Sequence, residues 1–255
     1  MTLSSSPSMS LGLSWRPLTT ADLPSWHALV RDIEAEDRPS ERCTVEDLQD
    51  ELENGSWKDP VADSLVGLDG NGVPVAFGHV EVRPGDTRVV RAFCWAGVHP
   101  AWRGRGIGSA LLRWQEEVAR RKVRARPDGT PGRMVVQVDE HLVRTRQLLE
   151  RAGLVPARWY VEMTRPLDAA HPIPEVALPP GYRIEPYSRA WSEQVRVAHN
   201  AAFADHWGSE PRSPEDWQRA TVGGRAFRAG WSHVALHAGD VVGYTVASAY
   251  PQDWA

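Results

Sequence analysis

The 255-residue sequence predicts an α/β fold: a mixed central sheet flanked by helices, built as one complete unit followed by a partial second unit. Three observations support this prediction. Segments with helical spacing of apolar residues alternate with short runs rich in Val and aromatic residues. A proline-rich stretch at 166–180 divides the chain, and the segment beyond it repeats the opening order of elements. The length also exceeds one ordinary domain of about 100 to 150 residues.

The first unit is expected to begin after a leader, because residues 1–13 are small or polar and lack periodicity, which is typical of a disordered end. A cap at Thr19 or Thr20 precedes a helix whose apolar positions follow helical spacing: Leu23, Trp26, Val30 and Ile33. Thr44 followed three residues later by Asp47 predicts the start of a second, acidic helix.

The remainder of the first unit alternates strands and helices. Runs 64–68 and 73–82, separated by turn residues, predict a hairpin, and run 89–98 predicts a third strand. The strongest helical pattern follows a glycine-rich stretch and comprises Ile107, Ala110, Leu111, Trp114 and Val118. A strand at 134–138, a helix from about Asp139 to a C-cap at Gly153, and a strand at 157–163 complete the order βααβββαβαβ.

The sequence beyond the connector resembles the first unit. Segment 234–245 aligns with 66–78 at an offset that falls from 168 to 167, and Pro186 lies 169 residues after Pro17. This internal similarity favours a duplicated domain. We therefore expect a complete domain at 14–165, a linker at 166–180 and the N-terminal half of a second domain at 181–255.

Composition narrows the functional classes. A formal net charge of -4 argues against a general nucleic-acid binder, and no apolar run is long enough to span a bilayer. Two cysteines without a disulfide or metal-ligand pattern suit a reducing, cytoplasmic setting and predict no metal site. Residues 1–60 carry an excess of acidic side chains and residues 101–165 an excess of basic ones. The asymmetry indicates either solvated helix faces or separate regions for a cation and an anion.

A glycine-rich segment between a strand and a helix is the most informative part of the sequence. Its glycines allow the backbone to bend and to direct its N–H groups at one point, where the helix dipole also favours an anion; they are Gly104, Gly106 and Gly108. A Rossmann fingerprint is excluded because Ser109 or Leu111 stands where its third glycine belongs. A Walker A loop is excluded because neither lysine follows a glycine.

The run from Arg103 to Gly108 matches R/Q-x-x-G-x-G/A, and segment 98–114 resembles the acetyl-CoA-binding motif of the GNAT family of N-acetyltransferases. The resemblance implies a GNAT fold, acetyl-CoA as cosubstrate and transfer of its acetyl group to a primary amine of a small molecule or peptide. It also implies that the cofactor is bound by Val98, Arg103, Gly104, Arg105, Gly106, Ile107, Gly108 and Ser109. Two such units in tandem resemble mycothiol synthase-like acetyltransferases, and an oligomer is compatible with the family.

The catalytic residues are less well marked. Leu149 and Leu142 stand where the family often has a Tyr acid and a pantetheine-binding Asn, so a cofactor-binding module without turnover remains an alternative. Glu81 is the candidate base, or else a charged strand end that faces water. Cys94 is expected to be a packing residue.

Three further groups each have two interpretations. One group either reaches the 3′-phosphate of CoA or complements a helix dipole: Arg120, Arg121, Lys122, Arg124 and Arg126. An acidic group either attracts a cationic acceptor or forms a solvated face: Asp32, Glu34, Glu36, Asp37 and Glu46. In the second unit, one group either lines an acceptor pocket or packs before a helix cap at Ser213: His206, Trp207 and Glu210.

Overall fold

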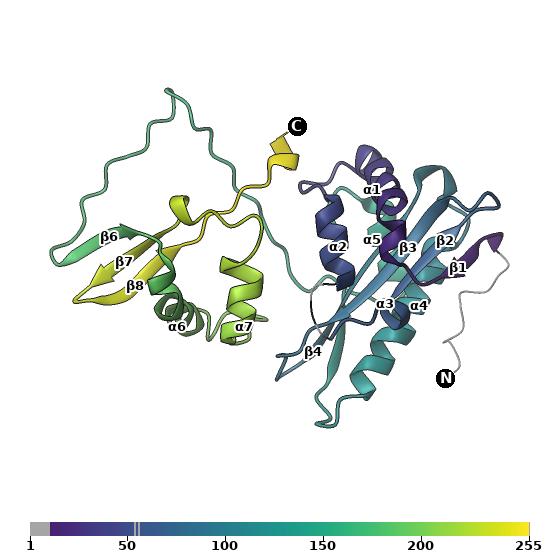
Figure 1. Ribbon diagram of the computed structural model, residues 1–255. Helices are drawn as coiled ribbons and strands as arrows, with labels where there is room; N and C mark the ends of the chain where they lie inside the picture. The colour runs from purple at the N-terminus through teal and green to yellow at the C-terminus, as the bar shows by residue number, and fades with distance from the viewer. Residues whose placement is uncertain (1–10, 54, 56, 255) are drawn as a thin grey trace. The chain divides into compact units, whose positions relative to one another are not determined.

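The computed structural model describes residues 11–53, 55 and 57–254 (Figure 1). The chain forms two compact units, one comprising Met1–Val155 with Gln252–Ala255 and the other Pro156–Pro251. Within the described residues, no helix has the length and apolar character needed to cross a membrane. The first of these is unit 1 and the second is unit 2.

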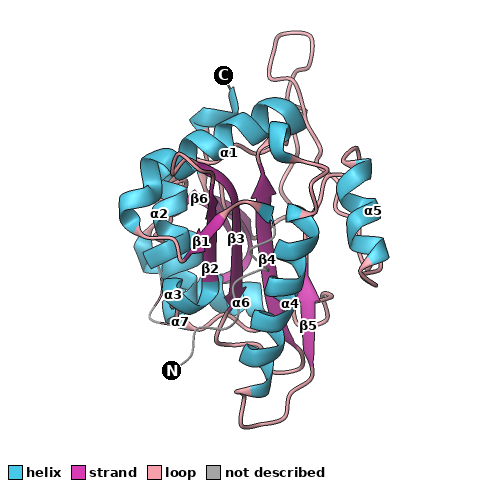
Figure 2. Ribbon diagram, turned by 90° about the vertical axis from the view of Figure 1, so that its right-hand side faces the viewer, coloured by secondary structure: helices cyan, strands magenta, loops and turns pink. Residues whose placement is uncertain are grey.

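Unit 1 is a five-stranded sheet with helices on both faces, as Figure 2 shows. The sheet order is β1-β2-β3-β4-β5; neighbours are antiparallel except for the parallel pair β4 and β5. The elements are β1 (Ser14–Arg16), α1 (Leu23–Asp37), α2 (Val45–Glu53), α3 (Pro60–Asp63), β2 (Ser64–Leu68), β3 (Pro74–Val82), β4 (Val90–Val98), α4 (Ile107–Arg124), β5 (Gly132–Val135) and α5 (Val143–Arg151).

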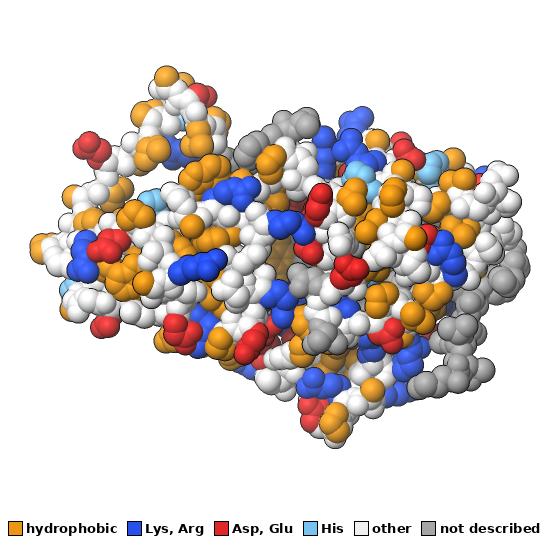
Figure 3. All heavy atoms as spheres, viewed as in Figure 1, with side chains coloured by type: hydrophobic (Ala, Val, Ile, Leu, Met, Phe, Trp, Pro, Cys, Tyr) orange, Lys and Arg blue, Asp and Glu red, His pale blue; other side chains and the backbone are white. Residues whose placement is uncertain are grey.

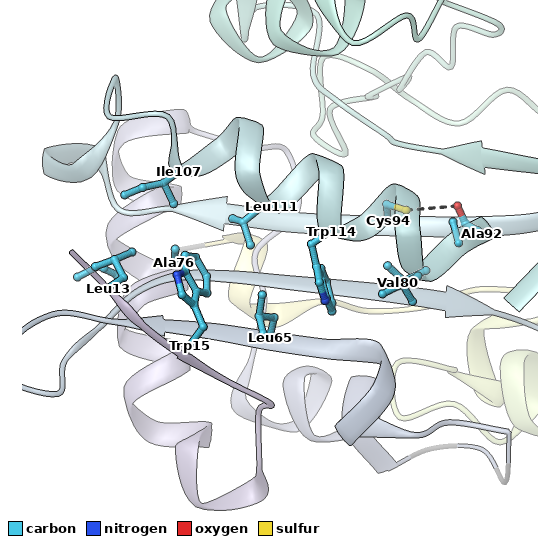
Figure 4. Close-up of a cluster of buried hydrophobic side chains, with 13 residues drawn as sticks. Leu13, Trp15, Leu65, Ala76, Val80, Ala92, Cys94, Ile107, Leu111 and Trp114 are labelled. Atoms are coloured by element: carbon cyan, nitrogen blue, oxygen red, sulfur yellow. Dashed lines mark hydrogen bonds between the residues drawn. The ribbon is translucent and has the colours of Figure 1, made fainter. Parts of the chain in front are cut away.

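The amphipathic helix α4 covers one face of this sheet. Ile107, Leu111 and Trp114 point from α4 onto the strands, where they join Trp15, Val80 and other strand residues in one buried cluster (Figure 4). Burying such side chains contributes roughly 1.5 to 3 kcal/mol each. This cluster fixes α4, and therefore its N-terminus, against the end of β4.

Helices α1 and α2 cover the opposite face. Trp26 of α1 is fully buried and packs edge-on against Phe77 of β3, with ring centroids 5.5 Å apart. Trp95 of β4 packs on Phe77 at 4.6 Å, and Leu48 of α2 completes the cluster. The predicted capping box at the start of α2 is confirmed, since Thr44 and Asp47 exchange side-chain and backbone hydrogen bonds.

Unit 2 contains a three-stranded antiparallel sheet in the order β6-β7-β8. Its helices pack on one face through a cluster that includes Val195, Trp217 and Leu236. The elements are β6 (Tyr182–Pro186), α6 (Ser192–Ala202), α7 (Pro214–Trp217), β7 (His233–His237) and β8 (Asp240–Thr245). These bounds agree with the strands and helices expected from the sequence.

The strand registers of unit 2 match those of unit 1 at the offsets seen in the sequence. Val66 pairs with Phe77, and Val234 pairs with Tyr244. A register shift falls between Gly67 and Leu68 in one unit and at the equivalent pair, Ala235/Leu236, in the other. Both hairpins therefore carry a β-bulge at the equivalent register position, where the ladder between the two strands is locally disrupted.

The strand expected at 157–163 was a wrong prediction. The structure gives this segment no regular structure, and Trp159, Tyr160 and Val161 are largely exposed. Its residue types favour a strand, but β-strands require a neighbour for their backbone groups, and Pro156 and Pro166 flank the segment. Hydrophobic side chains are accordingly visible at the surface along the extended segment that precedes β6 (Figure 3).

Three smaller expectations need adjustment. The helix expected from Asp139 begins at Val143, and the short helix α3 was not expected. The predicted leader lies outside the described residues as far as position 10. Its last residue, Leu13, is buried in the α4 cluster and is therefore part of the core rather than of a disordered end.

Candidate functional site

The sheet of unit 1 opens at the end of β4. Parallel pairing between β4 and β5 stops at Phe93, which lies opposite Val135, whereas β4 continues to Val98. Beyond Phe93, one edge of β4 has no strand beside it in the described part of unit 1. An extended ligand can therefore add to this edge by backbone hydrogen bonds.

Two hydrogen bonds establish which peptide groups face the open edge. The N–H of His99 donates to the carbonyl of Val75 on the β3 side, and the N–H of Val90 donates to the carbonyl of Pro131 on the β5 side. Because peptide groups alternate along a strand, even-numbered residues of β4 face β5. The backbone of Ala96 therefore points into the opening, as does that of Val98. Sequence analysis missed Ala96, although alternation back from Val98 identifies it.

The glycine loop lies immediately after this edge. Gly104 and Gly106 have φ angles of +79° and +85°, which favour glycine over residues with a side chain. A Cβ on Gly104 would meet no atom within 4 Å, so the loop surface is open there. A Cβ on Gly108 would lie 3.2 Å from Leu148 of α5, so this glycine permits close packing instead.

Six consecutive backbone N–H groups, from Gly104 to Ser109, have no acceptor among the described residues. The first hydrogen bond of α4 runs from the N–H of Ala110 to the carbonyl of Gly106. The unpaired N–H groups thus stand at the N-terminus of an 18-residue helix, which carries roughly half a positive charge. Such a row of N–H groups at a helix N-terminus suits an anion such as a phosphate group.

The two arginine side chains of the loop hold it in place. Arg103 makes a bidentate ion pair with Asp37 at 2.6 and 2.8 Å, and its Nε donates to the carbonyl of Val98 at 3.0 Å. Arg105 lies over the ring of Trp102, 4.5 Å from the centroid, and donates to a nearby carbonyl. Arg103 therefore fixes the loop to both α1 and β4, and its own N–H donates to the carbonyl of Pro100 rather than joining the unpaired N–H groups.

Glu81, the candidate base, lies on the α1/α2 face of β3 with its side chain about 10% exposed. It accepts a hydrogen bond from Nε of Arg83, forms an ion pair with the same guanidinium, and lies 3.7 Å from Lys58 Nζ. Burial alone would raise the pKa of this carboxyl, but the hydrogen bond and charge of Arg83, together with Lys58, hold the pKa of Glu81 below its ordinary value. Glu81 is thus an ion-paired carboxylate.

A second carboxylate lies in the same cluster. Glu51, at the end of α2, has its Oε2 3.5 Å from Nδ1 of His79 and 3.8 Å from Lys58 Nζ. Burial against these neighbours raises the pKa of Glu51, and burial lowers the pKa of His79 to about 4, so the imidazole is neutral at pH 7. Lys58 also donates to the carbonyls of Asp50 and Glu51, which fixes it to the end of the helix. Sequence analysis missed Glu51 and His79; the only local signal is that His79 and Glu81 share one strand face.

The basic group lies away from the glycine loop. Arg120 is 13 residues after the start of α4, about 20 Å along the helix axis. Lys122 pairs with Asp63, and Arg126 pairs with Asp128 and donates to the carbonyl of Asp86. These contacts favour a structural role over binding of the 3′-phosphate.

The remaining candidates are also placed. Of the acidic group, Asp37 pairs with Arg103, Glu34 accepts from the N–H of Cys43, and Asp32 lies 3.5 Å from His99. Burial raises the pKa of Cys94 to about 12, which keeps its thiol protonated and supports the packing role.

In the second unit, the expected cap at Ser213 is confirmed, because its side chain accepts from the N–H of Asp216. His206 Nδ1 lies 3.1 Å from the Ser209 hydroxyl, and the Arg158 guanidinium lies over the ring of Trp207.

The glycine loop, the open strand edge and the sheet define the class of protein. A family model described as the acetyltransferase (GNAT) family matches residues 26–154, which is half of the chain. The chain therefore belongs to the GNAT family of acetyltransferases.

Individual relatives agree with this assignment. A mycothiol acetyltransferase of Thermobispora bispora is 32% identical over 148 residues, which are 58% of this chain and 45% of that protein. A mycothiol acetyltransferase of Salinispora tropica is 31% identical over 69% of this chain and 53% of its own length. The chain thus spans about half the length of these curated relatives. A GCN5-related N-acetyltransferase from Sphaerobacter thermophilus shares the fold, with a TM-score of 0.67 at 18% identity over 94% of this chain and 76% of its own.

Proposed function

We propose that unit 1 binds acetyl-CoA and transfers its acetyl group to a primary amine of a small molecule or peptide. The observation that carries this proposal is the row of unpaired N–H groups from Gly104 to Ser109 at the N-terminus of α4. These groups suit a pyrophosphate, whose negative charge the helix end stabilises.

The open edge of β4 supports the same assignment. A pantetheine arm contains two amides, which can pair with the backbone of Ala96 and Val98 as an added strand would. The thioester would then lie near the point where β4 and β5 separate, beside Trp95. An N–H on this edge can also stabilise the oxyanion that forms when an amine attacks the thioester carbonyl.

Unit 2 enters the proposal as a partial copy of unit 1. The equal strand registers, the equivalent bulges and the matching helix starts support a duplicated domain, with boundaries at 14–165 and 181–255 and a linker between them. The identity to mycothiol acetyltransferases favours a small-molecule acceptor over a peptide, and the acceptor amine is the first property to screen.

The test is a calorimetric titration of acetyl-CoA into wild type and Gly106→Trp. A bulky side chain at this position fills the space in front of the N–H groups, so binding should fall more than about 100-fold, equivalent to ~2.7 kcal/mol. Gly129→Trp is the matched control, because Gly129 also has a positive φ and open space around its Cβ but lies beyond the far end of α4.

The control should bind within about threefold of wild type. If both variants weaken binding equally, the effect is backbone strain and the glycine loop is not the cofactor site. Circular dichroism spectra of all three proteins establish whether each variant is folded.

A second candidate function is a cofactor-binding module without turnover. The observation that favours it is Leu149, a half-buried residue of α5 at the position where the family often has its tyrosine acid. A single-turnover assay with a panel of primary amines separates the two functions. Release of CoA only in the presence of an amine supports transfer, whereas binding without release supports the module.

A further inference from the structure

The α1/α2 face of the sheet carries a group of ionisable side chains directly beside the opening of the sheet. His79 of β3 pairs in register with Trp95 of β4, the residue before Ala96 on the open edge. Trp95 is partly exposed and lies on the same face as His79. His79 is therefore the ionisable residue of β3 that lies directly beside Trp95, and its neighbour Glu51 is the more exposed of the two, with a side chain 37% exposed.

The two carboxylates of this group differ in how firmly they are held. Glu81 accepts a hydrogen bond of 3.0 Å from Nε of Arg83 and forms an ion pair at 2.9 Å with Nη2 of the same residue, and its side chain is about 10% exposed. The Glu51 carboxylate lies 3.5 Å from Nδ1 of His79 and 3.8 Å from Nζ of Lys58, and its side chain is 37% exposed. A base must reach the substrate, directly or through one water, and must exchange its proton, so the geometry favours Glu51.

We propose that Glu51, rather than Glu81, is the base that takes the proton from the acceptor amine, and that His79 is the positioning residue that orients its carboxylate. The proposal rests on the acetyl transfer proposed above. A neutral imidazole can donate one N–H to Glu51 without adding a positive charge that would hold the carboxylate ionised. Lys58 and Glu81 then serve to fix α2 against β3.

The step balances without a further reagent. The carboxylate of Glu51 accepts one proton from the ammonium form of the acceptor, and the freed nitrogen lone pair attacks the carbonyl carbon of acetyl-CoA. The C–N bond forms and the C–S bond breaks, so the acetyl group passes to nitrogen. The departing CoA thiolate takes a proton when the amide nitrogen loses its second one, and Glu51 returns its proton to solvent.

The test compares single-turnover rates of wild type, Glu51→Gln, Glu81→Gln and Glu53→Gln with the amine that reacts fastest in the panel. General-base catalysis contributes about 10² to 10⁴ in rate, so Glu51→Gln should lose at least about 100-fold. Glu53→Gln, an exposed carboxylate two residues further along α2, should react at the wild-type rate. Acetyl-CoA affinity should be unchanged in Glu51→Gln, because Glu51 is not among the residues proposed to contact the cofactor.

A pH profile distinguishes a base from a structural residue. The fold reduction in rate of Glu51→Gln should become smaller as pH rises toward the pKa of the amine, which is about 10 for an alkylamine. At such pH values the acceptor loses its proton to solvent and no longer needs a base on the protein. Glu51→Asp should recover part of the rate. The groups that set the charge around Glu51 are Asp50, Lys58, His79, Glu81 and Arg83.

The outcomes separate the two proposals. A wild-type rate in Glu51→Gln, or a loss that stays constant with pH, overturns the assignment of Glu51 and leaves acetyl transfer intact. A 100-fold loss in Glu81→Gln with none in Glu51→Gln assigns the base to Glu81. If wild type turns over with no amine in the panel, acetyl transfer and the role of Glu51 fail together, while calorimetry still reports whether acetyl-CoA binds.

Discussion

Units 1 and 2 begin alike and differ in what covers their sheets. Trp15 and Val75 face α4 in unit 1 and are 8% and 3% exposed. The residues at the equivalent register positions in unit 2, Ile184 and Val242, are 54% and 51% exposed. The same strand pattern is therefore buried or exposed according to the presence of one helix. Strand pairing alone sets the register, and the helix supplies the second layer of the core.

The same helix positions the proposed cofactor site. In unit 1 the α4 cluster holds the glycine loop beside β4, and Gly78 lets Leu111 and Trp114 approach the sheet closely. Thr245 stands at the register position of Gly78 in unit 2, where its hydroxyl accepts from the N–H of His233. The cofactor site proposed for this protein is thus a property of the α4 half of unit 1, whereas the proposed base Glu51 lies in the half whose elements both units share.

The largest expected effect comes from placing one charge at the two equivalent strand positions. Val75→Asp buries a carboxylate without a partner beneath α4, which should cost about 4 kcal/mol and unfold unit 1. Val242→Asp places the same group on an exposed face and should cost about 1 kcal/mol or less, mainly through lower strand propensity. Hydrogen exchange measured by mass spectrometry on 74–82 and 233–245 reports each unit separately.

Equal losses of protection in the two units would contradict this comparison. That result would mean that the exposed face of unit 2 is covered in solution, by another molecule or by the rest of the chain. Val80→Ala is the control for simple loss of packing, because it creates a cavity on the same face of β3 without adding a charge. It should lower the free energy of unfolding of unit 1 by about 2 kcal/mol.

Local patterns in the sequence were sufficient for most of the fold. The spacing of Ile107, Leu111 and Trp114 predicted α4, and the Thr44–Asp47 pair predicted the start of α2. Such elements are fixed by residues within one or two turns of each other. The internal offset led us to expect a duplicated domain, and the strand registers of unit 2 match those of unit 1 at that same offset.

The remaining features depend on contacts between distant segments. Strand propensity at 157–163 was not sufficient because no described strand pairs with it. Glu51 and His79 are 28 residues apart and meet only because α2 packs beside β3, so no local pattern marks them as a pair. Arg103 matched a motif position, yet its side chain was found to bind Asp37, which only the packing of α1 could reveal.

A smaller effect is expected from the buried histidine of unit 1. The pKa of His79 is lowered to about 4 in the folded protein from about 6.5 when unfolded, so the unfolded chain binds more protons between these values. Stability should therefore fall as pH decreases through this window, by about 2 kcal/mol between pH 7 and pH 5. Hydrogen exchange of 74–82 at the two pH values measures the loss.

The comparison with His79→Gln isolates this residue. In His79→Gln, the hydrogen exchange of peptide 74–82 should depend less steeply on pH than in wild type. The exchange of peptide 233–245 should change with pH to the same extent in both proteins, since the partly buried His199 of unit 2 is unchanged. An equally steep dependence in the variant would assign the pH sensitivity to other groups.

The smallest effect concerns a polar pair in unit 2. His199 and Tyr244 stand at the positions of Val30 and Phe77 in unit 1, and their Nδ1 and hydroxyl groups are 2.6 Å apart. Both side chains are partly exposed, so water can replace part of a lost hydrogen bond, and the pair should couple by about 1 kcal/mol. Hydrogen exchange of β8 in His199→Val, in Tyr244→Phe and in the double variant measures that coupling.

Each single change leaves one polar partner behind. The double change reproduces the apolar pair of unit 1, so it should destabilise unit 2 by less than the sum of the two single changes. Strict additivity would show that the contact contributes nothing. The reciprocal change Phe77→Tyr places a hydroxyl inside the buried cluster that also contains Val30, and should cost about 1 to 3 kcal/mol. Tolerance of that change would mean that the face of unit 1 beside α1 is wetter than its buried cluster implies.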